Sequence, residues 1–314
     1  MPTALILGVL GQDGSYLADS LLQRGYTVVG VGRSSTAIYD WPADRFHYVP
    51  LDLCDAAGLE TIVSEVRPDV AFHVAAVHGA IASGFAYEAV WREVMQVNVL
   101  ALHVLLEHAR TAAPAMRIIY AGSAKVFPAP WQGLVTAQTP MRATCLYGIS
   151  KLAARDLMRH YRHEHGVRST NLVLFNHDSP RRPSQFLLPK LGSAVAAALD
   201  GRPAVVTIRT LDFLIDWSAA DEIMGMVADI AAGPDVDELI VASGRTVKGR
   251  DIATALFERH NLRLEDHVLT EQPDSDTGPA FQVDIGDFIA AAGRRPRKTA
   301  LDIGEEIVTS LREY

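Results

Sequence analysis

Short apolar runs alternate with amphipathic stretches in the first part of the chain. Residues Ala4–Leu7 form one apolar run, leucines then recur at helical spacing until Gly25, and a second apolar run follows at Thr27–Val31. Runs that are apolar at every position are typical of strands buried on both faces of a parallel sheet, and the leucine spacing predicts a helix between them. The opening of the chain therefore predicts a strand–helix–strand unit.

The same alternation continues to residue 175. The further expected strands are Asp69–Ala75, Arg117–Ala121 and Asn171–Phe175, and the further expected helices are Val97–Ala109 and Ile149–His163. This alternation predicts an α/β fold with a doubly wound parallel sheet. After Phe175 the segments become shorter and more polar. We expect residues 1–174 to form the sheet domain and residues 175–314 to form mainly a smaller substrate lobe, with 211–232 returning to the sheet domain.

Composition narrows the classes of partner. The 314 residues are 49% apolar and 21% charged, as in ordinary globular proteins, and 29 basic against 37 acidic side chains give a net charge of −8. This charge repels polyanions, so no nucleic-acid partner is expected. The two cysteines, Cys54 and Cys145, are too few for a disulfide framework or a cysteine metal site, and no metal is expected. Without a signal-peptide pattern or a membrane-spanning apolar run, we expect a cytoplasmic protein with no membrane partner.

Three glycines lie at the junction of the first predicted strand and helix. Gly8, Gly11 and Gly14 are three residues apart, with Gln12 and Asp13 between the last two. Missing Cβ atoms allow a tight turn and a close approach of backbone amides to a pyrophosphate at the helix N-terminus. The triplet by itself also fits an ordinary strand–helix turn, but its place in a strand–helix–strand unit favours a dinucleotide site.

The end of the second predicted strand bears on the type of dinucleotide. An acidic residue there, roughly twenty residues after the glycines, holds the ribose 2′-hydroxyl of NAD. This chain has Arg33, Ser34 and Ser35 at that place, which favours the 2′-phosphate of NADP, although a solvated loop arginine is the alternative. Asp52 and Leu53 follow the next short strand and are expected to border the adenine, where an aspartate is also a common turn residue.

Tyr147 and Lys151 are the main catalytic candidates. They are four residues apart at the start of a predicted helix, so they share one face. An ammonium near a phenol stabilises the phenolate, which can then accept a proton from an alcohol as hydride leaves. Ser123, directly after a buried strand, can share that hydrogen bond, and Cys145 is a second candidate acid/base.

These motifs resemble the extended short-chain dehydrogenase/reductase superfamily, with the closest similarity to the GDP-mannose 4,6-dehydratases. The matching stretches are Gly8–Ala18, Asn98–Val99, Tyr147–Lys151 and Phe175–Arg182. The resemblance implies a Rossmann domain with a small substrate lobe, and an oxidoreductive triad of Ser123, Tyr147 and Lys151. It implies a homodimer as well. The other residues it implies are Ala75, Ala76, Asn176 and His177 around the cofactor, in addition to Tyr147 and Lys151, and His78, Asn176, Arg181 and Lys190 around the substrate with Ser123.

The chain departs from this family at the position two residues after the triad serine. The dehydratases carry a glutamate there, which removes the proton beside the transient ketone, whereas this chain has Lys125. A protonated amine is not a base, but burial and the nearby Lys151 would lower the pKa of Lys125. We expect Lys125 to transfer this proton; a lysine that only binds substrate or faces solvent is the alternative.

A second departure concerns phosphate binding. The dehydratases carry an Arg-Pro-x-Glu-Val-Asp segment that clamps the diphosphate, whereas the corresponding stretch here is Phe281–Asp284. The basic pair that precedes Asp216 and Trp217 in the family is replaced by Leu214 and Ile215. Charge-assisted contacts are therefore missing, so a neutral nucleoside or a sugar with less phosphate becomes an alternative to a sugar nucleotide as the substrate. The basic side chains that remain to compensate are Arg181, Arg182, Lys190 and Arg209.

These features together predict an NAD(P)-dependent dehydratase. The enzyme would oxidise a sugar hydroxyl transiently, eliminate water and return the hydride, giving either an exocyclic alkene or a 6-deoxy-4-keto sugar. The missing clamp suggests secondary metabolism, such as nucleoside-antibiotic biosynthesis. The alternatives are a sugar epimerase acting through a transient ketone, a ketone reductase and a dinucleotide-sensing protein without catalysis.

Overall fold

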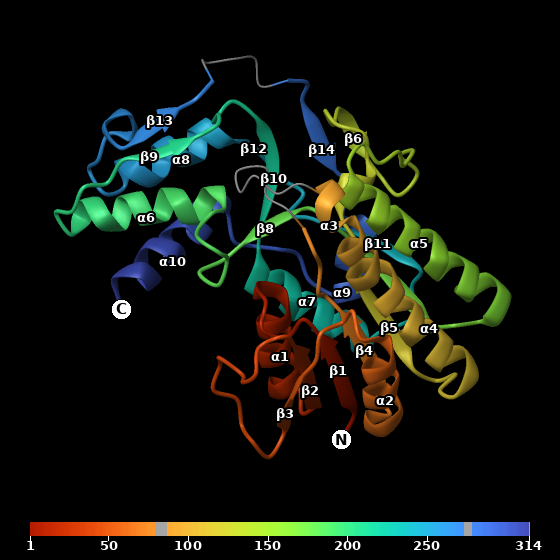
Figure 1. Ribbon diagram of the computed structural model, residues 1–314. Coiled ribbons are helices and arrows are strands. Elements are labelled where there is room, and N and C mark those ends of the chain that lie inside the picture. Colours follow the sequence, from red (N-terminus) through yellow and green to blue (C-terminus); the bar gives the residue numbers. More distant parts are fainter. Residues whose placement is uncertain (79–86, 273–277, 314) are drawn as a thin grey trace.

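A seven-stranded parallel sheet forms the centre of the computed structural model, which describes residues 1–78, 87–272 and 278–313 (Figure 1). The strand order is β11-β7-β5-β4-β1-β2-β3. In chain order the strands are β1 (Thr3–Leu7), β2 (Thr27–Gly32), β3 (Phe46–Pro50), β4 (Val70–His73), β5 (Arg117–Ala121), β7 (Ser169–Leu174) and β11 (Glu238–Val241). The predicted α/β fold with a parallel sheet is confirmed.

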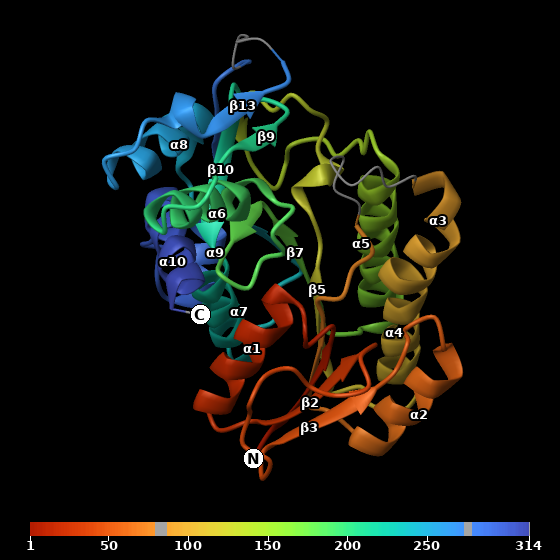
Figure 2. The same cartoon turned by 60° about the vertical axis from the view of Figure 1, so that its left-hand side comes forward.

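Helices cover both faces of this sheet (Figure 2). One face carries α2 (Ala56–Val66), α4 (Ala101–Thr111) and α5 (Leu146–His165), with α3 (Tyr87–Met95) beside α5. The other face carries α1 (Gln12–Gln23), α7 (Ala220–Ala232) and α9 (Gly286–Ala292). Strand β1 explains why its sequence run is apolar throughout: Ala4 and Ile6 pack into the core under α1 and α7, whereas Leu5 and Leu7 pack into the core under α2 and α4.

A smaller lobe is built from later segments and lies at the upper left in Figure 1. It contains α6 (Leu187–Leu199), α8 (Gly249–Glu258), α10 (Ala300–Arg312) and the paired strands β9 (Val206–Ile208) and β13 (Val268–Thr270). A three-stranded sheet of β8 (Asn176–Asp178), β10 (Leu214–Ala219) and β12 (Thr246–Lys248) connects the lobes, and β6 (Gly133–Val135) pairs with β14 (Phe281–Val283). After the first part of the smaller lobe, the chain returns to the main sheet domain through both α7 and β11. The returning segment therefore extends beyond residue 232, where it was predicted to end. The division of the chain at residue 174 stays a prediction.

The expected helix at Val97–Ala109 differs most from its prediction. The structure has a π-helical turn at Gln96–Leu100 and begins α4 only at Ala101. The apolar spacing that predicts this helix is insensitive to the hydrogen-bond pattern, because a single wider turn still leaves most apolar side chains on the buried face.

The described part of the chain has neither a membrane-spanning helix nor a cluster of metal-binding side chains. None of its helices is both long and apolar enough to cross a membrane. No three histidine, cysteine, aspartate or glutamate side chains in the described part of the chain converge in a way that would hold a metal ion.

Arg117 ties the sheet to the C-terminal end of α7. It begins β5, is 3% exposed, and its guanidinium donates to the carbonyl oxygens of Ile230 at 2.8 Å, Gly233 at 3.0 Å and Pro234 at 2.9 Å. These carbonyls lie at a helix end, where backbone acceptors lack helical partners and the dipole favours a cation.

We predict that Arg117→Ala lowers the free energy of unfolding by about 3 kcal/mol, because it leaves several buried carbonyls without donors. Urea unfolding followed by circular dichroism measures this change. The matched control is Arg110→Ala on α4, whose exposed pair with Glu107 should contribute nothing measurable. Equal effects of the two substitutions would contradict this account of Arg117.

Candidate active site

The predicted cofactor and catalytic residues converge at the carboxyl ends of the central strands. The glycine loop follows β1, Ala75 and Ala76 follow β4, and Ser123 follows β5, and these three strands are neighbours in the sheet. In open α/β sheets this edge is where ligands bind.

The glycine loop is shaped by two close backbone approaches. A Cβ on Gly8, whose φ is +91°, would lie 2.7 Å from the backbone of Ala75, and a Cβ on Gly14 would lie 2.3 Å from the carbonyl oxygen of Gly8. Gly11 is different, because a Cβ there would meet only the oxygen of Gly8 at 3.4 Å. Nothing in the protein excludes a side chain at Gly11, but a pyrophosphate that approaches the amides of α1 requires its absence. The loop therefore fits a dinucleotide.

Asp13 and His177 form an ion pair between this loop and β8. His177 Nε2 lies 2.9 Å from Asp13 Oδ1, and its Nδ1 lies 2.8 Å from the carbonyl oxygen of Phe175. Although burial by itself raises the pKa of Asp13, the charge and hydrogen bond of His177 hold this pKa well below its usual range. Burial lowers the pKa of His177, but Asp13 outweighs it and raises this pKa overall. Both shifts favour the charged form of their group.

Gln12 makes a second link at the same place. Its amide nitrogen donates to Asp13 at 3.0 Å, and its amide oxygen accepts from the hydroxyl of Ser179 at 2.9 Å. Gln12 also donates to the carbonyl oxygen of His177 on β8 at 3.3 Å, and Ser179 directly follows β8. The predicted cofactor roles of Gln12, Asp13 and His177 did not include these contacts between the loop and β8.

The predicted adenosine end lies beyond β2 and β3. Arg33 is exposed and forms an ion pair with Glu93 on α3 at 3.3 Å, and the carbonyl of the exposed Ser34 accepts from the hydroxyl of Tyr48. The carboxylate of Asp52 accepts from the amide of Cys54 at 2.9 Å, while Leu53 is buried. Asp52 therefore has the turn-forming contact that was its alternative interpretation, and Arg33 has an acidic neighbour.

The start of α5 carries Tyr147 and Lys151. Its cap is Cys145, whose sulfur accepts from the amide of Gly148 at 3.4 Å. A Cβ on Gly148 would lie 2.3 Å from the carbonyl oxygen of Lys125, so this glycine lets α5 approach the turn that follows β5. That approach brings Tyr147 and Ser123 to the same edge.

Lys151 lies in the buried floor of the site. Its Nζ donates to the carbonyl oxygen of Ala121 at 2.7 Å and to the hydroxyl of Tyr120 at 3.0 Å, and it lies 5.6 Å from the centre of the Tyr147 ring. The residue is 1% exposed. Burial lowers the pKa of Lys151 to about 7, against the opposing charge of Asp13.

Ser123 and Lys125 share a short 3₁₀ turn at Ala124–Val126. The hydroxyl oxygen of Ser123 accepts from the amide of Lys125 at 3.2 Å, which leaves its own proton to donate. The side chain of Lys125 is exposed. The burial on which the expected role of Lys125 depended is therefore absent, because the 3₁₀ turn leaves this side chain exposed while the backbone carbonyl of Lys125 packs against α5.

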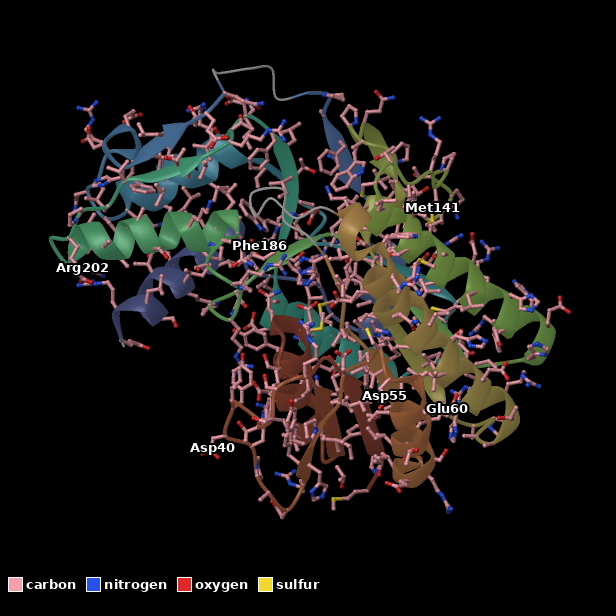
Figure 3. The ribbon with its side chains drawn as sticks, viewed as in Figure 1. Asp40, Asp55, Glu60, Met141, Phe186 and Arg202 are labelled. Atoms are coloured by element: carbon pink, nitrogen blue, oxygen red, sulfur yellow. The ribbon has the colours of Figure 1, made fainter. Side chains whose placement is uncertain are left out.

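The predicted substrate residues separate into two groups. His78 packs edge-to-face against Tyr147, with ring centres 6.1 Å apart, and against Phe186 at 5.7 Å. Figure 3 shows Phe186 between the two lobes, at the end of α6. Arg182 lies over the Phe186 ring at 3.8 Å and pairs with Asp178 at 3.2 Å. This arrangement brings Arg182 close to His78, whose pKa is lowered by burial and then by the charge of Arg182.

Arg181 lies elsewhere. It pairs with Asp19 of α1 at 2.8 Å and lies over the rings of Tyr16 at 4.0 Å and Tyr39 at 4.8 Å. Its predicted contact with substrate competes with these partners, so the neighbouring Arg182 is the better placed of the two. Of the remaining substrate candidates, Asn176 is exposed at the start of β8 and Lys190 is half-buried on α6.

The positions that lack the family's basic residues border a hollow of about 700 Å³. Among its described lining residues are Leu214, Phe281 and Gln282, and the one charged residue is Arg245. The guanidinium of Arg245 also donates to the carbonyl oxygens of Arg297 and Lys298. Neither this hollow nor an adjoining one of about 470 Å³ includes Tyr147 or Lys151, so both lie outside the reaction centre.

Three residues of the site were missed or given no role by sequence reasoning. Tyr120 is the hydrogen-bond partner of Lys151, Arg245 borders the hollow, and Asn98 contacts Tyr120, Val77 and Ser150. A hydroxyl within the otherwise apolar end of β5 was the available signal for Tyr120. No sequence signal pointed to Arg245, because its position beside the hollow depends on how β12 folds.

Two relatives with similar sequences carry the same functional name. A protein of Sordaria araneosa, named GDP-mannose 4,6-dehydratase sdnI, is 31% identical over 275 residues, which cover 84% of this chain and 49% of that protein. This chain therefore spans about half the length of the Sordaria protein. The GDP-mannose 4,6-dehydratase of Yersinia enterocolitica is 26% identical over 94% of this chain and 83% of its own length.

A solved structure matches the whole fold. The dTDP-glucose 4,6-dehydratase of Bacillus anthracis, solved in complex with NAD, superposes with a TM-score of 0.83 over 100% of this chain and 97% of that one, at 16% sequence identity. At this identity the match shows the shared fold alone.

The model of the family described as GDP-mannose 4,6 dehydratase matches residues 5–288. This match covers both lobes and includes the glycine loop, the Tyr147–Lys151 pair and the strand that carries His177. The resemblance stated from the sequence motifs is confirmed, and the chain belongs to the GDP-mannose 4,6-dehydratase family of the extended short-chain dehydrogenases/reductases.

Proposed function

We propose that this protein is an NAD(P)-dependent dehydratase that transiently oxidises a hydroxyl of a nucleotide-linked sugar and then eliminates water. The observation that carries the proposal is the buried ammonium of Lys151, one helical turn from Tyr147 and at the same sheet edge as the glycine loop and Ser123. Family membership supports the reaction class.

A nicotinamide cofactor accepts the hydride in this chemistry and later returns it. The loop from Gly8 to Gly14 would hold its pyrophosphate, Asp52 and Leu53 would border its adenine, and Tyr147 and Lys151 would contact its nicotinamide half. Arg33 and Ser34 favour a 2′-phosphate, hence NADP. The pair of Arg33 with Glu93 is exposed and therefore weak, so a phosphate can replace the carboxylate.

Tyr147 accepts the proton of the substrate hydroxyl, because the ammonium of Lys151 favours the phenolate. Ser123 donates a hydrogen bond to the same substrate oxygen. The resulting ketone acidifies the neighbouring C–H bond. A base then removes that proton, and the electron pair of the C–H bond forms the carbon–carbon double bond. The protonated base returns the proton to the hydroxyl on the next carbon, which leaves as water.

Lys125 is our candidate for this base, with Cys145 as the runner-up. Lys125 lies on the turn that Ser123 begins, but it would have to act as a neutral amine from an exposed position. The sulfur of Cys145 is engaged as the helix cap and lies two residues before Tyr147. The two candidates make different predictions for substitution.

The proposed class of substrate depends on which basic side chains are available to bind a phosphate. Arg182 and Lys190 remain candidates for a phosphate, and Arg245 adds a cation beside the positions where the family's basic residues are missing. We therefore favour a sugar nucleotide, and a nucleoside without a diphosphate is the other outcome of the product assay. A homodimer stays a prediction; Leu100 and Ile149, each 43% exposed, are apolar side chains available to a second copy.

Mass spectrometry of products tests the reaction class. We predict that the purified protein, incubated with GDP-mannose, UDP-sugars or free nucleosides, forms a product lighter by one water without net consumption of NADP or NAD. Tyr147→Phe should lower kcat by about 10²- to 10⁴-fold, because it removes the acid/base group. A product of unchanged mass would indicate an epimerase, and stoichiometric consumption of the reduced cofactor would indicate a reductase.

Substitution of the two base candidates separates oxidation from elimination. We predict that Lys125→Met still reduces the bound cofactor, measured by its absorbance, but forms no dehydrated product and does not exchange the neighbouring proton in D₂O. Cys145→Ser is the matched control and should retain both steps. Loss of exchange in Cys145→Ser, with exchange retained in Lys125→Met, would assign the base to Cys145 instead.

The cofactor preference depends on Arg33. We predict that Arg33→Ala raises the Kd of NADPH about tenfold or more and leaves the Kd of NADH nearly unchanged, because a charge-assisted contact to the 2′-phosphate is lost. Fluorescence titration measures both constants. Arg202→Ala is the control, since Figure 3 shows Arg202 at the far end of α6 from Phe186. Equal constants for NADPH in wild type and Arg33→Ala would identify Arg33 as a solvated loop residue.

A further inference from the structure

Tyr120 links Lys151 to the backbone of the π-helical turn. Its ring is fully buried, its hydroxyl accepts from Lys151 Nζ at 3.0 Å, and the same hydroxyl donates to the carbonyl oxygen of Asn98 at 2.7 Å. A carbonyl oxygen can only accept, so the phenolic proton is directed to Asn98. The lone pairs of the phenolic oxygen are therefore left for the ammonium.

The π-helical turn presents two consecutive carbonyls to the ends of adjacent strands. Val97 accepts at its carbonyl oxygen from His73 Nε2 at 2.9 Å, and Asn98 accepts from Tyr120. His73 and Tyr120 are directly opposite each other in the pairing of β4 and β5. The side chain of Asn98 is itself fixed, since its amide nitrogen donates to the hydroxyl of Ser150 at 3.0 Å. Turns of this type are rare and are frequent at functional sites.

The groups that face Lys151 come from four elements. Asp13 on α1 is negatively charged and favours the ammonium. His73 on β4 is neutral, because burial and then the charge of Lys151 lower its pKa to about 3. Tyr120 on β5 stays protonated, because burial raises its pKa well above the usual value, and Tyr147 lies on α5 itself.

The two hydrogen-bond acceptors of Lys151 among the described residues are thus neutral oxygens, on Tyr120 and Ala121, and both favour the charged form of the amine against burial. An ammonium has three N–H groups, so these two hydrogen bonds leave the third N–H group for another acceptor.

We propose that Tyr120 is a positioning residue of the reaction centre: its hydroxyl, oriented by the carbonyl of Asn98, keeps Lys151 charged and fixed beside Tyr147. The inference rests on the proposed function only in using Tyr147 as the proton-transfer group. Tyr120 touches neither substrate nor cofactor in this role and acts through Lys151 alone.

Tyr120→Phe tests the role, since it keeps the ring and removes the acceptor. The readout is the phenolate absorbance of Tyr147 during a pH titration of the holoenzyme, isolated by subtracting the titration of Tyr147→Phe in the same background. We expect the midpoint to rise by about one pH unit, because Lys151 loses its charge at lower pH and no longer favours the phenolate. Turnover should show a fall in kcat of about tenfold at neutral pH with KM changed less than about twofold.

Two further variants show that the effect passes through Lys151. In a Lys151→Met background, Tyr120→Phe should shift the Tyr147 midpoint no further. Tyr161→Phe is the matched control, because it also removes a largely buried hydroxyl, one that contacts His103 and Glu107 at the far end of α5, and it should leave the midpoint unchanged. An unchanged midpoint in Tyr120→Phe, or an equal shift with and without Lys151, would overturn the proposal.

The titration also separates this inference from the proposed function. It needs no turnover, so a chain that proves to be an epimerase would still show the shift if Tyr120 acts as proposed. If Tyr120→Phe alone does not fold, the double variant with Lys151→Met is expected to recover folding. The second substitution removes the buried ammonium that Tyr120→Phe leaves without an acceptor. A double variant that also fails to fold would contradict the coupling.

Discussion

A lysine buried at the carboxyl edge of a parallel sheet is the constraint on which the rest of the site depends. Removing an ammonium from water is costly, and the structure offsets this cost with neutral oxygens from β5 and with the charge of Asp13. The balance leaves the pKa of Lys151 at about 7, so the ammonium that favours the Tyr147 phenolate is lost as the pH rises above neutral. Three elements must therefore keep their relative positions: the turn before α4, the end of β5 and the start of α5. A shift in any of them would leave the ammonium of Lys151 buried without its hydrogen-bond acceptors.

The glycine loop connects this centre to the substrate lobe. Gly8 and Gly14 are fixed by contacts inside the protein, and Gly11 leaves the amides of α1 open to a pyrophosphate. The charged pair of Asp13 and His177 then joins the loop to β8, the strand that leads into the second lobe. A buried pair of this kind contributes more to the definition of geometry than to net stability.

Under the proposed function, the chain would keep the oxidative half of its family's chemistry and change the parts that act on the rest of the substrate. Ser123, Tyr147 and Lys151 gather at the sheet edge, whereas an exposed Lys125 stands in place of the family's carboxylate and Leu214 in place of a basic residue. Oxidation of an alcohol needs only a hydride acceptor and a base on the hydroxyl, so it is independent of these changes. In the proposed reaction, the position of the abstracted proton and the phosphate content of the substrate would depend on these changes, because those parts of the substrate would face the altered positions.

The sequence by itself determined the parallel α/β fold, the glycine loop and the Tyr147–Lys151 pair. These features depend on short-range spacing: apolar runs of strand length, glycines three apart, and two side chains one helical turn apart. Only the tertiary structure decided that Tyr120 and Asn98 hold Lys151, that Asp13 pairs with His177, that Arg181 turns to α1 while Arg182 lies over the Phe186 ring, and that Lys125 is exposed. These contacts join residues that lie far apart in the chain, or depend on the direction of a side chain within a turn. Spacing along the sequence specifies neither, because both are set by how the strands and helices pack.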